Sequence, residues 1–157
     1  HTMVEGQGRL RQPRLVGRVN AGLEFYVGVI GNADALALPP MEMDFTGFPT
    51  DRPRIASWAA KWGDDGDEKG EEFAGTRTFV SKDLTPELDE LLRKTALDAF
   101  HALRLRDYAR VDMRASAAGE VYVIEVNPNC YLEESGEFAR SAAADGMSYD
   151  ALIGRLI

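Results

Sequence analysis

Cysteine and histidine are scarce in this 157-residue sequence, which contains one cysteine, Cys130, and two histidines, His1 and His101. One cysteine cannot form a disulfide within the chain, and this set is too small for a cysteine-rich or histidine-rich metal site. Basic side chains are also in deficit, because 18 lysines and arginines face 26 acidic side chains, for a formal net charge of -8. This balance repels nucleic-acid backbones and anionic lipid, so we expect no nucleic-acid partner and no binding to a membrane surface.

Long apolar runs are absent as well. No segment approaches the roughly 20 apolar residues that span a bilayer, and no basic and then apolar signal pattern opens the chain. We therefore expect a cytoplasmic protein, for which a low cysteine content is typical. A histidine precedes Met3, and the next residues are polar, so we expect residues 1–14 to be a tag remnant and a flexible lead-in. Residues 15–157 are then expected to form one domain, a piece of a longer protein.

Strand and helix patterns alternate along the rest of the chain. Residues 24–30 are aromatic and β-branched and predict a strand, and a second strand is expected over 36–45. Pro39 and Pro40 interrupt this second strand, so we expect it at a sheet edge or bulge. Residues 107–116 and 120–127 predict a β-hairpin. Together these patterns indicate an α+β fold, with a mainly antiparallel sheet flanked by helices.

The clearest helix signal begins at Thr85, an N-cap candidate that is followed by Pro86 at the first helical position. Apolar residues then recur at helical spacing as far as Leu103, which predicts a scaffold helix packed on the sheet. Two further helices are expected over 133–144 and 148–156. His101 falls off the apolar stripe, so we interpret it as a solvent-facing or locally satisfied histidine.

An acidic run at residues 64–68 superficially resembles a calcium-binding loop. Counting from Asp65 puts Lys69 at the fifth position and Thr76 at the twelfth, where an EF-hand needs an oxygen ligand and a bidentate glutamate. We therefore interpret the run as a solvated acidic loop.

The predicted hairpin contains most of the candidate functional residues. Alternation places Arg110, Asp112 and Arg114 on one face of the first strand, and it groups Val121, Val123, Glu125 and Asn127 on one face of the second. A turn of two or four residues would set Asp112 opposite Glu125 and Arg110 opposite Asn127. A three-residue turn over Ala117–Gly119 would spoil this register unless a bulge intervenes.

Two carboxylates that face each other across a sheet repel, unless a cation lies between them. Asp112, Glu125 and Asn127 offer only hard oxygen atoms, which suit Mg²⁺ or Mn²⁺ and argue against zinc or copper. The alternative is a solvated ion network in which Asp112 and Glu125 pair with Arg110 and Arg114. Spacing alone leaves both interpretations open.

A family resemblance favours the metal site. The segment ARVDMRASAAGEVYVIEVNPN resembles the metal-binding hairpin of ATP-grasp ligases. Together with EFYVGVIGN, SWAAKWG and GMSYDALIGRLI it is similar to the C-terminal part of D-alanine–D-alanine ligases and their relatives, over most of the chain from about Leu15. The resemblance implies an ATP-grasp C-terminal subdomain that uses ATP and Mg²⁺ or Mn²⁺.

Residue roles follow from the same resemblance. Asp112, Glu125 and Asn127 match the magnesium ligands, with Glu125 bridging two ions between the β- and γ-phosphates. Arg110 matches the arginine that stabilises the oxyanion of the tetrahedral intermediate. Glu24 matches the acidic residue that contacts the ATP ribose, and Lys61 the lysine that reaches the phosphates. Residue types alone would instead make Glu24 an exposed strand glutamate and Lys61 a lysine lying along neighbouring tryptophans.

The implied reaction joins an amino-acid-like carboxylate to an amine through an acyl phosphate, with release of ADP and phosphate. Relatives also carry a substrate-binding N-terminal lobe and a central subdomain, for which this chain has no room, and we count both as partners of the domain. We therefore expect the isolated chain to be catalytically silent and to self-associate as a homo-oligomer through its uncovered apolar face. The alternative is a non-catalytic folded fragment, or an interaction module, that retains the metal face.

Two departures from the family concern specificity. Gly17-Arg18 stands where relatives often carry an acidic pair, which changes the expected contacts to adenine. After Asn127 the chain lacks the Ser/Gly-rich turn of D-alanine ligases, so the substrate pair stays open. Cys130 lies in this replaced segment, and we interpret it as a passive small residue rather than a reactive thiol.

Overall fold

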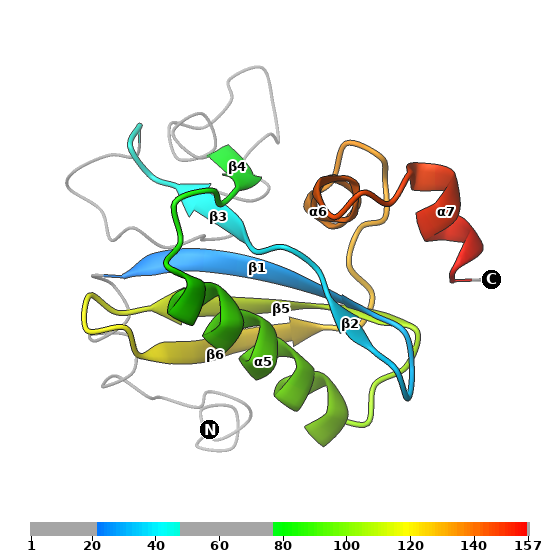
Figure 1. The fold of residues 1–157 in the computed structure, drawn as a ribbon, viewed down its shortest axis with the longest axis horizontal. Coiled ribbons are helices and arrows are strands. Elements are labelled where there is room, and N and C mark those ends of the chain that lie inside the picture. Colours follow the sequence, from blue (N-terminus) through cyan, green and yellow to red (C-terminus); the bar gives the residue numbers. More distant parts are fainter. Residues whose placement is uncertain (1–21, 48–76, 157) are drawn as a thin grey trace, which may run out of the picture.

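The computed structural model describes residues 22–47 and 77–156, which form one sheet with helices on both sides (Figure 1). The sheet has the strand order β4-β3-β1-β5-β6, with β2 paired to β1 off this path, and the pairings between the described strands are all antiparallel. The strands are β1 Leu23–Ile30, β2 Leu36–Ala37, β3 Met41–Asp44, β4 Arg77–Val80, β5 Tyr108–Ala115 and β6 Val121–Asn127; the helices are α5 Pro86–Ala102, α6 Glu137–Ala144 and α7 Tyr149–Gly154. The predicted α+β class is confirmed.

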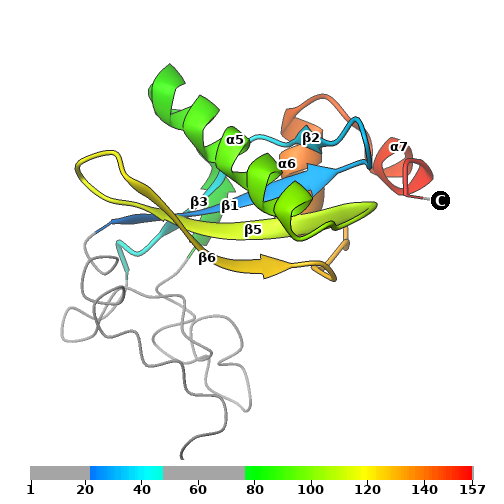
Figure 2. The same cartoon turned by 90° about the horizontal axis from the view of Figure 1, so that it is seen from below.

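Helix α5 begins where its cap signal predicts. The side chain of Thr85 accepts a hydrogen bond from the backbone N–H of Leu88, and Pro86 opens the helix. Figure 2 shows α5 lying along one side of the sheet. Its buried residues are Leu92, Ala96 and Phe100.

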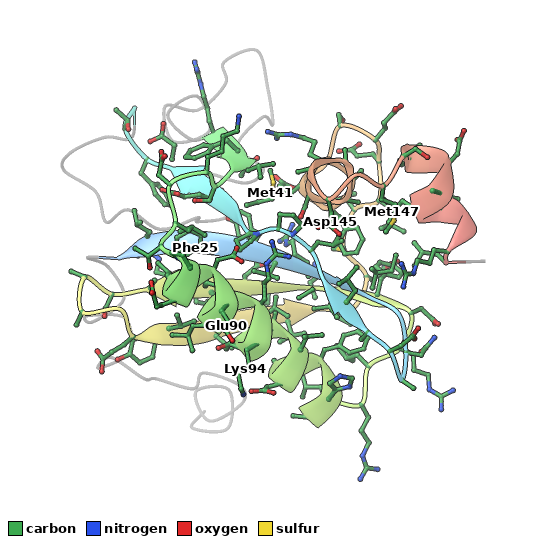
Figure 3. All side chains as sticks on the ribbon, viewed as in Figure 1. Phe25, Met41, Glu90, Lys94, Asp145 and Met147 are labelled. Atoms are coloured by element: carbon green, nitrogen blue, oxygen red, sulfur yellow. The ribbon has the colours of Figure 1, made fainter. Side chains whose placement is uncertain are left out.

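Strand alternation gives the sheet an apolar face and a polar face. The apolar face packs under α5 and consists of Phe25, Val27, Val29, Ala109, Val111, Met113 and Ala115. Burying a large apolar side chain contributes about 1.5–3 kcal/mol, so this core supplies most of the stabilisation of the layer. Figure 3 labels Phe25 on the helix side of β1, and Glu90 and Lys94 on the outer surface of α5. The intervening residues of β1 and β5 form what we call the polar face, and they comprise Glu24, Tyr26, Gly28, Arg110, Asp112 and Arg114.

The predicted second strand, which was expected at a sheet edge or bulge, is present as two short strands. It is divided into β2 and β3, which both pair with β1, and β3 also pairs with β4 on its other side. Pro39 and Pro40 lie between the two short strands, outside both ladders, where the missing N–H groups cost no ladder hydrogen bond. Among the described strands, β2 pairs only with β1, whereas β3 lies between β1 and β4, so the expected edge position is wrong for β3. The prolines need no edge there, because they lie between the two strands.

The two C-terminal helices pack together at one end of the sheet (Figure 1). The first begins four residues later than predicted, at Glu137, because residues 133–136 form a turn and Gly136 is the N-cap. Ile30, Leu38, Cys130, Phe138 and Leu152 belong to the apolar cluster that holds α6 and α7 in place. Within the two described ranges, no helix combines the length and the apolarity needed to cross a membrane.

Candidate functional site

The hairpin of β5 and β6 combines a three-residue turn with a bulge. Ser116 and Glu120 close the turn through the hydrogen bond from Ser116 N–H to Glu120 O at 2.8 Å, and Gly119 has a φ of 80°. A positive φ is the conformation that glycine adopts without strain, which suits the last position of such a loop. Val123 pairs with Met113, but Glu125 pairs with Asp112, so Ile124 is the extra residue on β6.

This bulge restores the register that the turn would otherwise shift. Asp112 lies directly opposite Glu125, and Arg110 lies opposite Asn127. Directly opposite residues have Cβ atoms roughly 4.5–5.5 Å apart on the same face of a sheet, so the two carboxylates and the amide are neighbours. The pairing thus places Asp112, Glu125 and Asn127 near one another, and their convergence in one coordination sphere stays a prediction.

The bulge also corrects one sequence-based assignment. Val121 and Val123 pair with Ala115 and Met113, on the α5 side, whereas Glu125 pairs on the polar face. Simple alternation had grouped all of them on one face, which was wrong because Ile124 reverses the alternation. Tyr122, opposite Arg114, joins the polar face instead.

Arg110 and Asp112 form a two-point ion pair on the polar face. Nε of Arg110 donates to Oδ1 of Asp112 at 2.7 Å, and Nη2 donates to Oδ2 at 3.0 Å. The ring of Tyr26 lies under the guanidinium, with its centroid 4.7 Å from Cζ, within the range of a cation–π contact. On the α6 side, Nη1 of Arg110 lies 3.8 Å from Oε2 of Glu137.

The charge of Arg110 is well compensated. Burial acts to lower the pKa of Arg110, but the hydrogen bond and charge of Asp112, together with the charge of Glu137, raise it above its ordinary value. The side chains of Arg110 and Asp112 are only 13% and 3% exposed. This pair is one half of the ion network that the sequence left open as an alternative.

A second ion pair lies one row along the same face. Nε and Nη2 of Arg114 both donate to Oε2 of Glu24, at 3.1 and 3.0 Å. The hydroxyl of Tyr26 donates to the other carboxylate oxygen of Glu24 at 2.9 Å. Burial and the charges of Glu24 and Asp112 raise the pKa of Tyr26 far above its ordinary value, so its hydroxyl stays a donor. Glu24 is buried rather than exposed on its strand, and its expected contact with a ribose stays a prediction.

The oxygen donors near the edge strand suit a small divalent cation. Asp112 is buried, Asn127 is half-buried and Glu125, on β6, is exposed. A carboxylate offers about four acceptor positions, and the hydrogen bonds from Arg110 to Asp112 occupy two of them. Oδ1 of Asn127 accepts from the N–H of Asn129 at 2.9 Å, which fixes the direction of its carbonyl.

In the described part of the chain, no three aspartate, glutamate, histidine or cysteine side chains form a group that would hold a metal by themselves. Two carboxylates and an amide oxygen therefore do not make an all-protein cage. They match the usual protein share of a Mg²⁺ site, in which one or two carboxylates are joined by water and substrate phosphates. The donor set thus fits Mg²⁺ in the company of a phosphate.

The other positions singled out in the sequence lie away from the polar face or outside the described residues. Lys61 and the acidic run at 64–68 lie outside the described residues. His101 is exposed on α5, where its ring contacts Phe100 edge-on. Cys130 is buried in the cluster under α6, and burial raises the pKa of its thiol to about 11. The thiol is therefore held in its unreactive, protonated form, in keeping with a packing role.

Sequence reasoning missed two residues that contact Arg110. Tyr26 could have been found by extending strand alternation to residues 24–30, because it shares a face with Glu24. Glu137 gives no such signal, since it lies on a helix far along the chain from the hairpin.

Comparison with protein families identifies the class of this fold and site. A family model described as D-ala D-ala ligase C-terminus matches residues 4–157, and the chain therefore belongs to this family. The resemblance noted in the sequence is thereby confirmed at the level of an ATP-grasp, D-alanine–D-alanine ligase-like C-terminal domain.

Two relatives match this chain over most of its length. A D-alanine–D-alanine ligase from Desulfotalea psychrophila is 29% identical over 136 residues, which cover 87% of this chain and 38% of the relative. An uncharacterised protein from Sinorhizobium fredii is 28% identical over 149 residues, which cover 93% of this chain and 40% of that protein.

Solved structures show the same likeness. The D-alanine–D-alanine ligase of Bacillus anthracis complexed with ATP superposes with a TM-score of 0.60 at 26% identity, covering 86% of this chain and 36% of that one. The D-alanine–D-alanine ligase of Coxiella burnetii gives 0.64 at 21% identity, covering 86% and 30%, which is a likeness of fold. The chain thus spans 40% or less of the length of these proteins.

Proposed function

We propose that this chain supplies the metal and phosphate side of an ATP- and Mg²⁺-dependent ligase that joins a carboxylate to an amine. The observation that carries the proposal is the hairpin register, which pairs Asp112 with Glu125 and Arg110 with Asn127 through the bulge at Ile124. A bulge is a feature that re-aims side chains at functional sites, and this one brings two like charges face to face. Such an arrangement is costly without a cation and useful with one.

The proposed reaction has two steps. The γ-phosphoryl group of ATP passes to an oxygen of the carboxylate substrate, which gives an acyl phosphate and ADP. The amine of the second substrate then attacks the acyl carbon, so that a C–N bond forms, the bond to phosphate breaks and the amine loses a proton. We propose that both substrates are amino-acid-like molecules, by analogy with the ligases to which the chain is similar.

Magnesium, when bound, would neutralise the phosphate charge during transfer, and Asp112, Glu125 and Asn127 would hold it. The remaining work falls to side chains of the protein. The guanidinium of Arg110 keeps its positive charge because Asp112 and Glu137 raise its pKa, so it can stabilise an oxyanion. Lys61 is proposed to contact the phosphates. Glu24 is proposed to contact the ribose hydroxyls, for which its carboxylate, 4% exposed and hydrogen-bonded to Arg114 and Tyr26, would have to turn outward. ATP and Mg²⁺ are abundant in the cytoplasm, where we propose that the protein acts.

Binding of Mn²⁺, a spectroscopic substitute for Mg²⁺, tests the proposal. Free Mn²⁺ is measured by electron paramagnetic resonance while the 157-residue chain is titrated, with and without ADP. We expect ADP to strengthen Mn²⁺ binding, because phosphate oxygens complete the coordination that the protein begins. Asp112→Asn and Glu125→Gln should each weaken binding at least roughly tenfold, which corresponds to a loss of about 1.4 kcal/mol.

Glu90→Gln is the matched control, because Glu90 is an exposed carboxylate on the outer side of α5. It changes the net charge equally and should leave Mn²⁺ binding unchanged. Equal losses in all three variants would mean that Mn²⁺ responds only to overall charge, and the proposed site would then be wrong.

Catalysis is the second arm of the test. ADP release from Mg-ATP is assayed with a panel of amino acids, both for this chain and for the natural gene product that contains it. We expect no turnover by the chain alone, because positioning of ATP, carboxylate and amine supplies roughly 7–11 kcal/mol of such barriers and relatives use a longer chain for it. Amino-acid-dependent turnover by the isolated chain, abolished by Asp112→Asn, would refute this expectation.

A further inference from the structure

Glu137 is an acidic residue beside the site that has no role so far. It is the first residue of α6, and its Oε2 lies 3.8 Å from Nη1 of Arg110. Its other oxygen, Oε1, accepts a hydrogen bond from the hydroxyl of Thr78 on β4 at 3.4 Å. Its side chain is 31% exposed, compared with 3% for Asp112. Arg110 therefore stands between two carboxylates of unlike burial.

The placement of Glu137 results from a glycine on β1. Gly28 pairs with Arg110 across the sheet, and a Cβ on it would lie 2.9 Å from the ring of Phe138. Because this position has no side chain, Phe138 packs directly beside the row that carries Arg110. The residue before Phe138 on α6 is Glu137, so this close packing carries its carboxylate toward the guanidinium.

Polar contacts hold α6 in this position. Arg140 donates from Nη2 to the backbone oxygen of Thr78 at 2.7 Å and from Nη1 to its hydroxyl at 3.2 Å. Ser141 donates from its hydroxyl to the backbone oxygen of Pro39 at 2.5 Å. The start of a helix is also a favourable place for an acidic side chain such as Glu137. These contacts hold the backbone at Glu137 in place beside Arg110.

A divalent cation at Asp112 would conflict with the present position of Arg110. Arg110 donates to both oxygens of Asp112, so a guanidinium and a metal ion would share one carboxylate at close range. Like charges at such a distance repel, and the repulsion is strong where the groups are shielded from water. Arg110 is largely buried, and loss of Asp112 without a replacement partner would leave its charge poorly compensated.

We propose that Glu137 is a second acceptor for Arg110, to which the guanidinium turns when Asp112 engages a cation. The shift is small, since an N–O distance of 3.8 Å needs to shorten by only about 1 Å to reach a charge-assisted hydrogen bond. The ring of Tyr26 lies 4.7 Å from the guanidinium carbon in the present arrangement, and a shift of about 1 Å would keep the contact within the roughly 6 Å range of a cation–π interaction. Glu137 is a positioning residue in this scheme, and the metal part of the scheme rests on the proposed function.

A thermal double-mutant cycle tests the second acceptor without any metal. Asp112→Asn removes the charge of Asp112, as a bound cation would neutralise it. In this variant Arg110 should turn to Glu137, so a moderate decrease in melting temperature is expected. Glu137→Gln alone should have little effect, because its contact with Arg110 is long and partly exposed. The double variant should melt several degrees lower than the sum of the two single shifts predicts.

Glu134→Gln is the matched control for the cycle, because Glu134 is an exposed glutamate in the loop before α6. Combined with Asp112→Asn it should give additive shifts. Glu137→Asp, which keeps the charge, should restore part of the lost coupling. Additive shifts for Glu137→Gln as well would overturn the proposal, whether or not the chain binds a metal.

Binding of Mn²⁺ supplies the second measurement, made on the 157-residue chain without nucleotide. Glu137→Gln should weaken Mn²⁺ binding roughly three- to tenfold, because Arg110 then competes harder for Asp112. Arg110→Gln should tighten binding, and in that background Glu137→Gln should have an effect of less than about twofold. Equal effects of Glu137→Gln in both backgrounds would show a general charge effect and overturn the proposal.

The two measurements separate the inference from the proposed function. A coupled thermal cycle with no Mn²⁺ binding that depends on Asp112 would support Glu137 as the second acceptor and contradict the metal site. An additive cycle with strong Mn²⁺ binding that depends on Asp112 would do the reverse.

Discussion

The buried ion pair between Glu24 and Arg114 makes the sharpest prediction about stability. Arg114 and Glu24 have side chains that are 1% and 4% exposed, and two N–H groups of Arg114 converge on one carboxylate oxygen. Replacing only one partner takes the opposite charge of the ion pair away from the other, which remains buried in the sheet face. We therefore predict that Glu24→Gln and Arg114→Met are each strongly destabilising.

The magnitude follows from burial. Removing one member of a buried ion pair costs about 3–5 kcal/mol, because the remaining charge has lost its compensation. One kcal/mol shifts the melting temperature of a chain of this size by roughly 2–4 °C, so each single variant should lose roughly 6–20 °C. The double variant Glu24→Gln/Arg114→Met should recover most of this loss, since it removes both charges and keeps an acceptor for the hydroxyl of Tyr26.

Urea unfolding and thermal melts of the four proteins give the coupling energy. The matched control is the exposed pair of Lys94 and Asp98 on α5, whose side chains are 67% and 65% exposed. Lys94→Met and Asp98→Asn should couple by only about 0.3–0.5 kcal/mol. If the cycle at Glu24 and Arg114 gives an equally small value, then solvent reaches the pair and our view of it as a structural element is wrong.

Three further predictions concern packing, reactivity and assembly. Gly28→Ala should destabilise the chain by about 1–3 kcal/mol in urea unfolding, because the added methyl group meets Phe138. Gly154→Ala is the control and should not destabilise the chain, because the space around Gly154 is open. Equal effects of the two variants would contradict the packing at Gly28. Cys130 should react with iodoacetamide far more slowly in the folded chain than in urea at pH 8, because its pKa of about 11 leaves little thiolate. Since folding raises this pKa, the free energy of folding linked to the protonated thiol is present at neutral pH and lost as pH rises toward 11. Fast labelling of the folded chain would contradict the burial of Cys130. Sedimentation velocity should show self-association that Ile124→Lys weakens, since Ile124 is 52% exposed on β6, and a purely monomeric profile at high concentration would count against it.

Local signals in the sequence were sufficient for the helix α5 and for the existence of the hairpin. Thr85 and Pro86 act within one helical turn, so their effect does not depend on the rest of the fold. The break at Pro39-Pro40 was also visible, but its consequence was not. A proline cannot donate a hydrogen bond to a strand ladder, so it must lie at an edge or outside the ladder. In this chain both prolines lie between two strands, and no local sequence pattern distinguishes this solution from an edge strand.

The hairpin register depends on more than local signals. Three residues in the turn and an alternating second strand are compatible with two registers, and the choice is made by what each face must pack against. Val121 and Val126 both pack on the core under α5, although they are five positions apart, an odd spacing that would put them on opposite faces of a regular strand. Only a bulge at Ile124 satisfies both, and it is the same bulge that pairs Glu125 with Asp112. Packing on the apolar face therefore sets the chemistry of the polar face.

Burial divides the polar face into two parts with different tasks. On the inner strands, Glu24 and Arg114 form an ion pair almost completely out of contact with water, which is a structural arrangement. Toward β6 the acidic groups become more accessible, from Asp112 to the exposed Glu125, and here the negative charge exceeds what Arg110 can neutralise alone. A ligand of positive charge gains most where compensation is incomplete and solvent access is retained. Solvent exposure therefore increases from the buried pair of Glu24 and Arg114 toward Glu125 on β6. This gradient explains why one face of a sheet can be both a buried framework and a candidate binding site.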